Sequence, residues 1–232
     1  MNIAVEEVAR DTLQQRVAAR LRELLTEGAI APGSKLNERV LCERLGVSRT
    51  PLREAIRLLA AEGLITLDPG RGAFAASLSV ADVGHAFDVM AALEGLAGEL
   101  AASSITDAEL AELRALQYEM QASFERRDLH SYYRLNARVH ELINAAARNP
   151  VLEVVWRQLN ARLHALRFRS NQDEHKWARA VQEHAAMVQA LQARDGAKMR
   201  ELLVEHLQRK RDVVLAQISA PHAPSTVSAL NS

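Results

Sequence analysis

The chain of 232 residues has a single cysteine, Cys42. One thiol cannot form an internal disulfide bond or a zinc site of paired cysteines, and such sparse cysteine usage fits a reducing compartment. The opening segment MNIAVEEVARDTLQQ lacks the basic and apolar parts of a secretory signal. No uncharged apolar run approaches the length of a membrane span. We therefore expect a cytoplasmic protein with no membrane partner.

An excess of charge of either sign is also missing, because 29 basic residues balance 29 acidic ones. Any binding to nucleic acid must therefore come from a local basic patch. Aromatic residues make up only 4% of the chain, whereas alanine and leucine are abundant, which favours helices. The length allows two modest domains. We expect a mainly α protein.

The N-terminal part shows the element order of a winged helix-turn-helix. Residues 10–28 carry an apolar stripe at helical spacing and end at a Pro-Gly turn. Capping residues and short apolar runs then predict two helices and a hairpin, with the helices starting after Asn37 and Ser48 and the strands over 64–67 and 73–76. We expect this DNA-binding fold over residues 10–77.

Residues 78–218 are expected to form an all-α antiparallel helical bundle of about six helices. The predicted breaks are a capping box, two further helix starts and two loops: Thr106–Glu109, Asp128, Asn149-Pro150, Ser170–Asp173 and Arg194–Gly196. We expect residues 1–9 to be a flexible N-terminus and residues 219–232 to be a disordered tail.

The third predicted helix carries a cationic stripe on a different face from its apolar residues. Arg49, Arg53 and Arg57 recur every four residues, and Ser48 and Thr50 add hydroxyl groups at the start of the helix. Arginine can bridge phosphates or bind guanine with two hydrogen bonds in the major groove. A single exposed arginine is usually only solvated. The stripe, the element order and a Gly-Arg-Gly hairpin tip that suits a wing together favour double-stranded DNA as the partner.

Three histidines fall on the apolar faces of three different predicted helices. They are His140, His184 and His206, and Asn136 lies one turn before His140. A lone core histidine is more often a packing residue than a ligand. Three of them with an inward asparagine indicate a divalent transition metal, with zinc favoured and nickel, manganese or iron also suited. Such a site leaves positions open for water or an anion.

The N-terminal part resembles the winged-helix domain of the GntR superfamily. The stretches PGSKLNE and LGVSRTPLREAI carry the resemblance, which extends over nearly all of residues 10–77. It implies that seven residues meet DNA: Arg39, Ser48, Arg49, Thr50, Arg53, Gly70 and Arg71. Arg39 and Arg49 would read guanines, and Arg71 takes a wing position that is often basic.

Residues 80–218 resemble the FadR C-terminal domain, or FCD domain, the sensor of one GntR branch. The shared motifs are LEGLAGELAA from Leu93, the pair Asn136 and His140 before Asn149-Pro150, Glu183-His184, and the late His206. The resemblance implies that Asn136, His140, His184 and His206 bind a metal. A carboxylate metabolite commonly completes the coordination in the family.

This sequence departs from the pattern of the FCD family at two positions. Asn136 stands where aspartate is commoner, and a neutral amide is a weaker ligand for a divalent ion than a carboxylate. Met90 stands where the family often has an arginine. If that arginine holds an acidic effector, another group must do so here, and Arg162 is our candidate.

We expect a homodimeric transcription regulator, a repressor that binds a short inverted repeat and responds to a small organic acid. A competing interpretation is a metal-dependent enzyme that uses the three histidines. Against it, no general base is placed beside them, since Glu183 should point about 100° away from His184 on the same helix. The pattern also allows an architectural DNA-binding protein, or the same regulator without a metal.

Overall fold

The computed structural model describes residues 12–26, 28–169 and 174–219. The chain divides into two compact units, Met1–Ser77 and Leu78–Ser232. The expectations for residues 1–9, for the loop 170–173 and for the tail from residue 220 onward fall outside the described residues. Within the described part of the chain, no helix combines the length and the apolar character that crossing a membrane requires.

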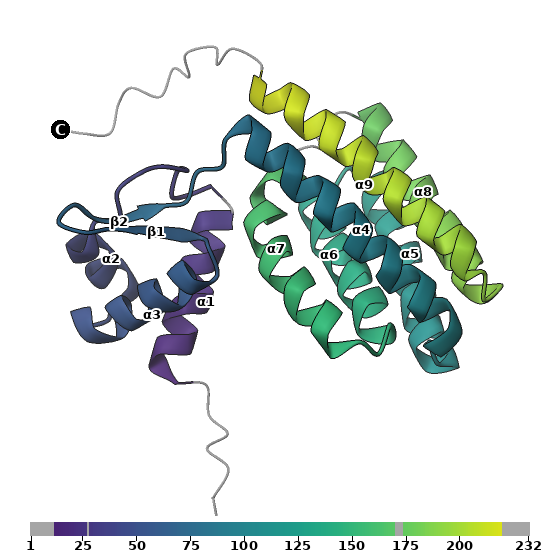
Figure 1. The fold of residues 1–232 in the computed structure, drawn as a ribbon, viewed down its shortest axis with the longest axis horizontal. Coiled ribbons are helices and arrows are strands. Elements are labelled where there is room, and N and C mark those ends of the chain that lie inside the picture. The colour runs from purple at the N-terminus through teal and green to yellow at the C-terminus, as the bar shows by residue number, and fades with distance from the viewer. Residues whose placement is uncertain (1–11, 27, 170–173, 220–232) are drawn as a thin grey trace, which may run out of the picture. The chain divides into compact units, whose positions relative to one another are not determined.

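The first unit is a winged helix-turn-helix, as predicted (Figure 1). Its elements are α1 (Leu13–Thr26), α2 (Glu38–Leu45), α3 (Arg49–Ala61), β1 (Ile65–Asp68) and β2 (Gly72–Ala75). The strands pair antiparallel, with Ile65 opposite Ala75 and Asp68 opposite Gly72. Leu21 of α1 packs in a core with Leu52 and Leu59 of α3, all three fully buried.

Local signals set the helix ends of this unit. The Asn37 side chain accepts hydrogen bonds from the backbone amides of Arg39 and Val40, so it caps α2. Gly46 ends α2 with a φ of 65°, a left-handed conformation that glycine adopts without strain. Ser48 occupies the N-cap position of α3, but its hydroxyl makes no capping hydrogen bond.

The second unit is an all-α bundle, again as predicted. The described residues form α4 (Val80–Ser104), α5 (Asp107–Glu125), α6 (Leu129–Ala146), α7 (Pro150–Arg169), α8 (Glu174–Gln192) and α9 (Gly196–Ser219). Ser79 and Thr106 form capping boxes at the starts of α4 and α5. Asp128 caps α6 by accepting from the Ser131 amide, and Asn149 accepts from the Leu152 amide at the start of α7.

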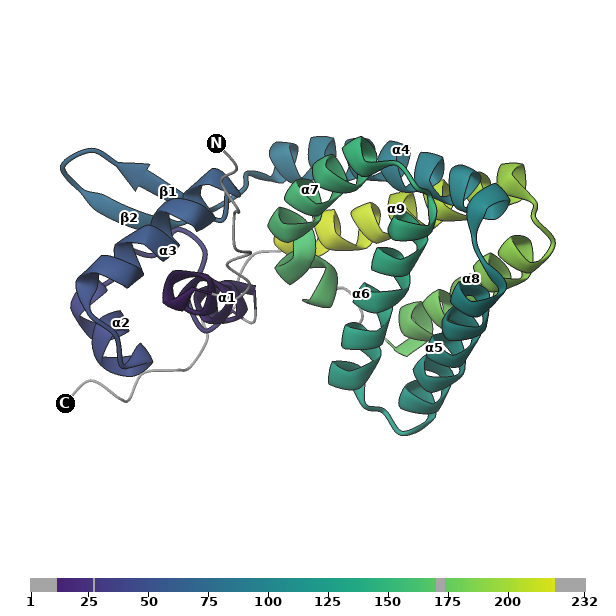
Figure 2. The ribbon, with the colours of Figure 1, turned by 90° about the horizontal axis from the view of Figure 1, so that it is seen from below.

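Helices α4 and α9 lie side by side along the bundle (Figure 2). Gly95 and Gly98 of α4 make this close approach possible. A Cβ atom added at Gly95 would lie 2.8 Å from Cγ2 of Val204, and one at Gly98 would lie 2.8 Å from Cγ of Met199 and closer still to Leu203. Any larger side chain would force the two helices apart.

The core of the bundle contains a group of buried polar residues among apolar ones. Large buried side chains such as Leu113, Met120 and Met187 form the apolar part. Glu94, Asn136, His140, His184 and His206 are each at most 5% exposed. Burying so many polar side chains is costly unless they are paired or bind something.

We expect Gly98→Ala to lower the free energy of unfolding by about 1–3 kcal/mol, because the methyl group overpacks the α4–α9 contact. Gly84→Ala on the same helix is the matched control, since its nearest neighbour would be Leu215 at 3.9 Å. It should leave stability unchanged or raise it by up to about 1 kcal/mol through helix propensity. Urea denaturation of both variants checks this, and equal stability of the two would contradict it.

Candidate DNA surface and buried histidine site

All seven residues predicted to meet DNA are exposed on the first unit. They are Arg39, Ser48, Arg49, Thr50, Arg53, Gly70 and Arg71. Helix α3 buries its apolar face and presents the arginine stripe to solvent. The structure thus has the cationic surface that the sequence predicts. Contact of each residue with DNA stays a prediction.

Three of these arginines pair with nearby carboxylates. Arg53 Nε lies 3.0 Å from Oε2 of Glu38, and Arg39 Nη1 lies 3.2 Å from Oε1 of Glu43. Arg71 Nη1 lies 3.1 Å from Oδ2 of Asp68. Exposed ion pairs of this kind contribute about 1 kcal/mol or less. These ion pairs therefore orient the guanidinium groups, and DNA phosphates can readily replace the carboxylates as partners.

The hairpin tip suits close approach to another backbone. Gly70 and Gly72 have φ angles of 82° and 106°, which residues with a Cβ rarely adopt. A Cβ at Gly70 would meet no atom within 4 Å, so the backbone there is open. Arg71 lies between the two glycines and is exposed.

In the second unit, His140 of α6, His184 of α8 and His206 of α9 come together as a histidine triad. Each is at most 2% exposed. One ring nitrogen from each residue lies within 4.8 Å of the others, and the ring centroids are 4.9 to 5.6 Å apart. The convergence expected from three separate apolar faces is therefore present in the fold.

Each imidazole of the triad has its Nδ1 atom beside an acceptor. Nδ1 of His140 lies 2.7 Å from Oε2 of Glu94, and Nδ1 of His206 lies 2.6 Å from Oε2 of Glu183. His184 Nδ1 donates to the Ala180 carbonyl at 2.7 Å. Among the described residues, none offers a hydrogen-bond partner to any of the three buried Nε2 atoms. Three clustered histidines thus each have a buried nitrogen without a partner, an arrangement that fits a metal ion.

Glu94 and Glu183 are parts of the site that the sequence did not reveal. Glu94 is 1% exposed and also accepts a hydrogen bond from Nε1 of Trp156 at 3.1 Å, so it joins α4, α6 and α7. Adjacent residues on a helix point in different directions, so Glu183 diverges from its neighbour His184. Its carboxylate contacts His206 on α9. The only sequence signal was the position of both glutamates within motifs of the resembled family.

Burial keeps two histidines of the triad, His184 and His206, neutral. It lowers the pKa of His184 well below its ordinary value, and the nearby His206 and His140 add to this effect. Burial also lowers the pKa of His206 to about 4, although its hydrogen bond to Glu183 opposes the shift. Burial raises the pKa of Glu183, but His206, Arg209 and Arg179 outweigh this and hold the pKa below its ordinary value. At neutral pH, His184 and His206 are therefore neutral and Glu183 is ionised.

Asn136 lies on the same face of α6 as His140. Tyr132, Asn136, His140 and Asn144 recur every four residues, and all four are buried. The Asn144 side chain donates to the His140 carbonyl at 3.0 Å. Asn136 is therefore close to the triad along its own helix, and its role as a ligand stays a prediction.

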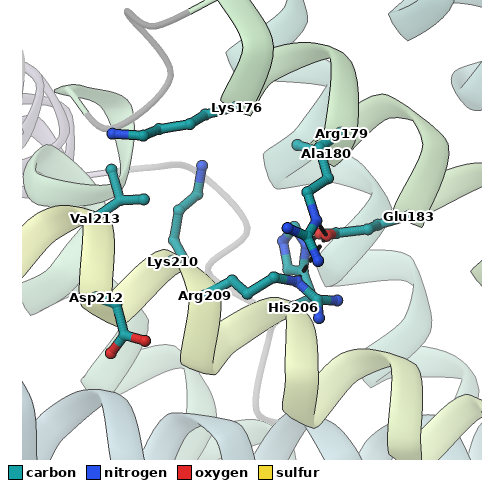
Figure 3. Close-up of a pocket in the computed structure, with 9 residues that line it drawn as sticks. All are labelled: Lys176, Arg179, Ala180, Glu183, His206, Arg209, Lys210, Asp212 and Val213. Atoms are coloured by element: carbon teal, nitrogen blue, oxygen red, sulfur yellow. Dashed lines mark hydrogen bonds and ion pairs between the residues drawn. The ribbon is translucent and has the colours of Figure 1, made fainter.

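A pocket of about 230 Å³ lies between α8 and α9, next to the triad (Figure 3). Seven of its lining residues are charged or titratable: Lys176, Arg179, Glu183, His206, Arg209, Lys210 and Asp212. We call it the α8–α9 pocket. Arg162, our sequence candidate for an acidic effector, is exposed on α7 and does not line this pocket. Met90, at the position where the resembled family often has an arginine, is fully buried.

A winged helix with an exposed arginine stripe, joined to a separate helical domain, defines a DNA-binding transcription regulator. Residues 13–75 match the gntR family of bacterial regulatory proteins, and residues 85–209 match the FCD domain. The chain belongs to the GntR family, in the FadR-type branch that carries an FCD domain. It is therefore a regulator and not an enzyme.

Curated relatives extend over most of the chain. The HTH-type transcriptional repressor RspR of Escherichia coli K12 is 29% identical over 196 residues, which are 84% of this chain and 86% of that protein. The gluconate operon transcriptional repressor of Bacillus subtilis 168 is 26% identical over 204 residues, 86% of this chain and 84% of that protein. The solved structure of E. coli McbR/YncC has the same fold, with a TM-score of 0.80 at 24% identity over 90% of this chain and 99% of that one.

Stability in the presence of a chelator should fall as the pH drops from about 6.5 toward 4. In this pH window His206 becomes protonated in the unfolded chain but stays neutral in the folded chain, because its pKa falls from 6.5 to about 4 on folding. The unfolded state therefore binds more protons and is favoured as the pH drops. Urea midpoints at several pH values measure the effect. His184→Gln removes one such histidine and should show a smaller loss between pH 7 and 5. The same loss in the variant and the unmodified protein would show that buried His184 does not resist protonation.

Proposed function

We propose that the protein is a homodimeric repressor that binds a short inverted repeat of double-stranded DNA and responds to a small organic acid in a metal-containing helical domain. It would act in the cytoplasm, where it meets its operator. The observation that carries the proposal is the cluster of three histidines in a regulator's second domain, each with a buried Nε2 atom that has no hydrogen-bond partner among the described residues. Such atoms are costly to bury without a partner.

On DNA, α3 would enter the major groove. Arg39 and Arg49 would read guanines, and Arg53 would make a further groove contact. The start of α3, with Ser48 and Thr50, would bind a phosphate through backbone amides and hydroxyl groups. The wing tip at Gly70 and Arg71 would reach the backbone or the minor groove. The exposure of all these residues supports this docking.

Exposed apolar side chains on α4 and α7 support a dimer. Val151, Val154 and Val155 share one face of α7 and are 73%, 56% and 43% exposed. Val89 and Leu96 on the neighbouring α4 are 52% and 37% exposed. A second copy that covers this face would remove apolar surface from water. It would also present two recognition helices, as an inverted repeat requires.

The names of the relatives favour repression over activation. RspR and the gluconate operon protein are both named as repressors. In our proposal, ligand binding changes the spacing of the two DNA-binding heads and releases the operator. Coupling of this kind is typically worth about 1–3 kcal/mol.

The residues of the triad fit a divalent metal ion. His140, His184 and His206 would hold it through Nε2, and Asn136 would add an oxygen ligand. Zinc is favoured, and nickel, manganese or iron would also suit these ligands. A bound ion would supply positive charge that attracts a carboxylate. Glu94 and Glu183 would orient the imidazoles and raise their basicity, as carboxylates beside metal-bound histidines commonly do.

Replacement of Arg49 and Arg53 together by alanine should abolish specific DNA binding. Loss of two groove contacts costs roughly 2–6 kcal/mol. Fluorescence anisotropy with the promoter region beside the protein's own gene measures the affinity, and Arg20→Ala on α1 is the exposed control. Unchanged affinity in the double variant would refute the DNA surface. A footprint not confined to one inverted repeat would instead favour an architectural DNA-binding protein.

The purified protein should retain about one divalent ion per chain, measured by elemental analysis after growth with zinc, nickel, manganese and iron. His184→Gln should lose the ion, and Glu94→Gln should weaken its affinity about 10- to 100-fold. His85→Gln is the control, because His85 is exposed on α4. If the unmodified protein retains no ion and none of the four metals raises its melting temperature, the histidines only pack the core.

A further inference from the structure

Trp156 of α7 packs in one apolar cluster of the helical domain, while its polar group reaches the surroundings of the triad. Its ring is 2% exposed and belongs to a cluster with Phe87 and Met90 of α4 and Leu207 of α9. The apolar neighbours of the triad on α6 belong to a different cluster. The indole N–H nevertheless donates to Glu94, which lies beside the triad. Trp156 is therefore anchored in one cluster and bonded toward the other.

The carboxylate of Glu94 lies between an indole and an imidazole. Its Oε1 accepts from Nε1 of Trp156 at 3.1 Å, and its Oε2 lies 2.7 Å from Nδ1 of His140. All three residues are at most 2% exposed. The two oxygens of a carboxylate share one rigid plane, so a hydrogen bond that fixes one oxygen also sets the direction of the other. The indole N–H thus keeps Oε2 directed at His140.

The α4 backbone alone does not fix this carboxylate. Gly95 and Gly98 place α4 against α9, but the side chain of Glu94 still has several rotatable bonds. A buried carboxylate also needs hydrogen-bond donors, and Trp156 supplies one. Because the indole is neutral, it orients the carboxylate without adding a positive charge that would repel a bound cation.

We propose that Trp156 is a positioning residue of the triad, whose N–H orients Glu94 and thereby the His140 ring for a divalent ion. This inference rests on the metal site of the proposed function. A carboxylate beside a metal-bound histidine fixes the orientation of the ring, and its loss typically weakens the affinity for the ion about 10- to 100-fold. Trp156 acts one hydrogen bond further out, so its loss should have a smaller effect.

The affinity of the full chain for zinc, measured by competition with a chromophoric chelator, tests the inference. Trp156→Phe keeps an aromatic ring but removes the N–H, and it should bind zinc roughly three- to tenfold more weakly. Trp177→Phe is the matched control. Its ring is also buried, but no described residue accepts a hydrogen bond from its Nε1. This control should bind zinc as tightly as the unmodified protein.

Two further variants separate the hydrogen bond from the packing of the ring. Benzothienylalanine at position 156 carries sulfur in place of the N–H and keeps the shape of tryptophan, so it should fold and still bind zinc more weakly. In a Glu94→Ala background, Trp156→Phe should cause no further loss, because its effect passes through Glu94. A further loss as large as in the unmodified background would show that Trp156 acts only by packing.

The hydrogen bond itself has a readout that needs no metal. In a proton–nitrogen NMR spectrum of the metal-free protein, Glu94→Ala should shift the indole N–H signal of Trp156 and leave that of Trp177 in place. Zinc affinity of the benzothienylalanine protein equal to that of the unmodified protein would overturn the positioning role and leave the metal site standing. Absence of zinc binding in the unmodified protein would reject the metal site and the positioning role together.

Discussion

The placement of three buried imidazoles next to one another is the constraint on which the histidine site depends. Glu94, Glu183 and the Ala180 carbonyl each have an oxygen within 2.7 Å of the Nδ1 atom of one ring, and the three Nε2 atoms are buried without hydrogen-bond partners among the described residues. These acceptors come from two different helices, α4 and α8. A shift of any of the contributing helices therefore changes the geometry of the whole triad.

Close packing of α4 on α9 brings the Glu94–His140 pair and the His206–Glu183 pair together. Gly95 and Gly98 follow Glu94 within about one turn of α4, and they face residues just before His206 on α9. Glu94 then reaches His140, while His206 reaches Glu183 on α8. The backbone of α4 at these glycines lies directly against side chains of α9, which leaves the two helices little freedom to shift relative to each other.

Local chemistry explains what the sequence could predict. The caps at Asn37, Thr106 and Asp128 act within a few residues, so the helix starts were predicted correctly. Convergence of the triad followed because each histidine lies on an apolar face. The pairing of Glu183 with His206 was missed, since it joins two helices whose relative register no local pattern encodes. The cations of the α8–α9 pocket were missed for the same reason.

The most direct test of the account is a crystal structure of the protein soaked with zinc, with diffraction data collected at the zinc absorption edge. The account predicts one anomalous peak per chain, at about 2.0–2.1 Å from Nε2 of His140, His184 and His206. A bundle in which the three Nε2 atoms still converge, with no anomalous peak among them, would contradict it.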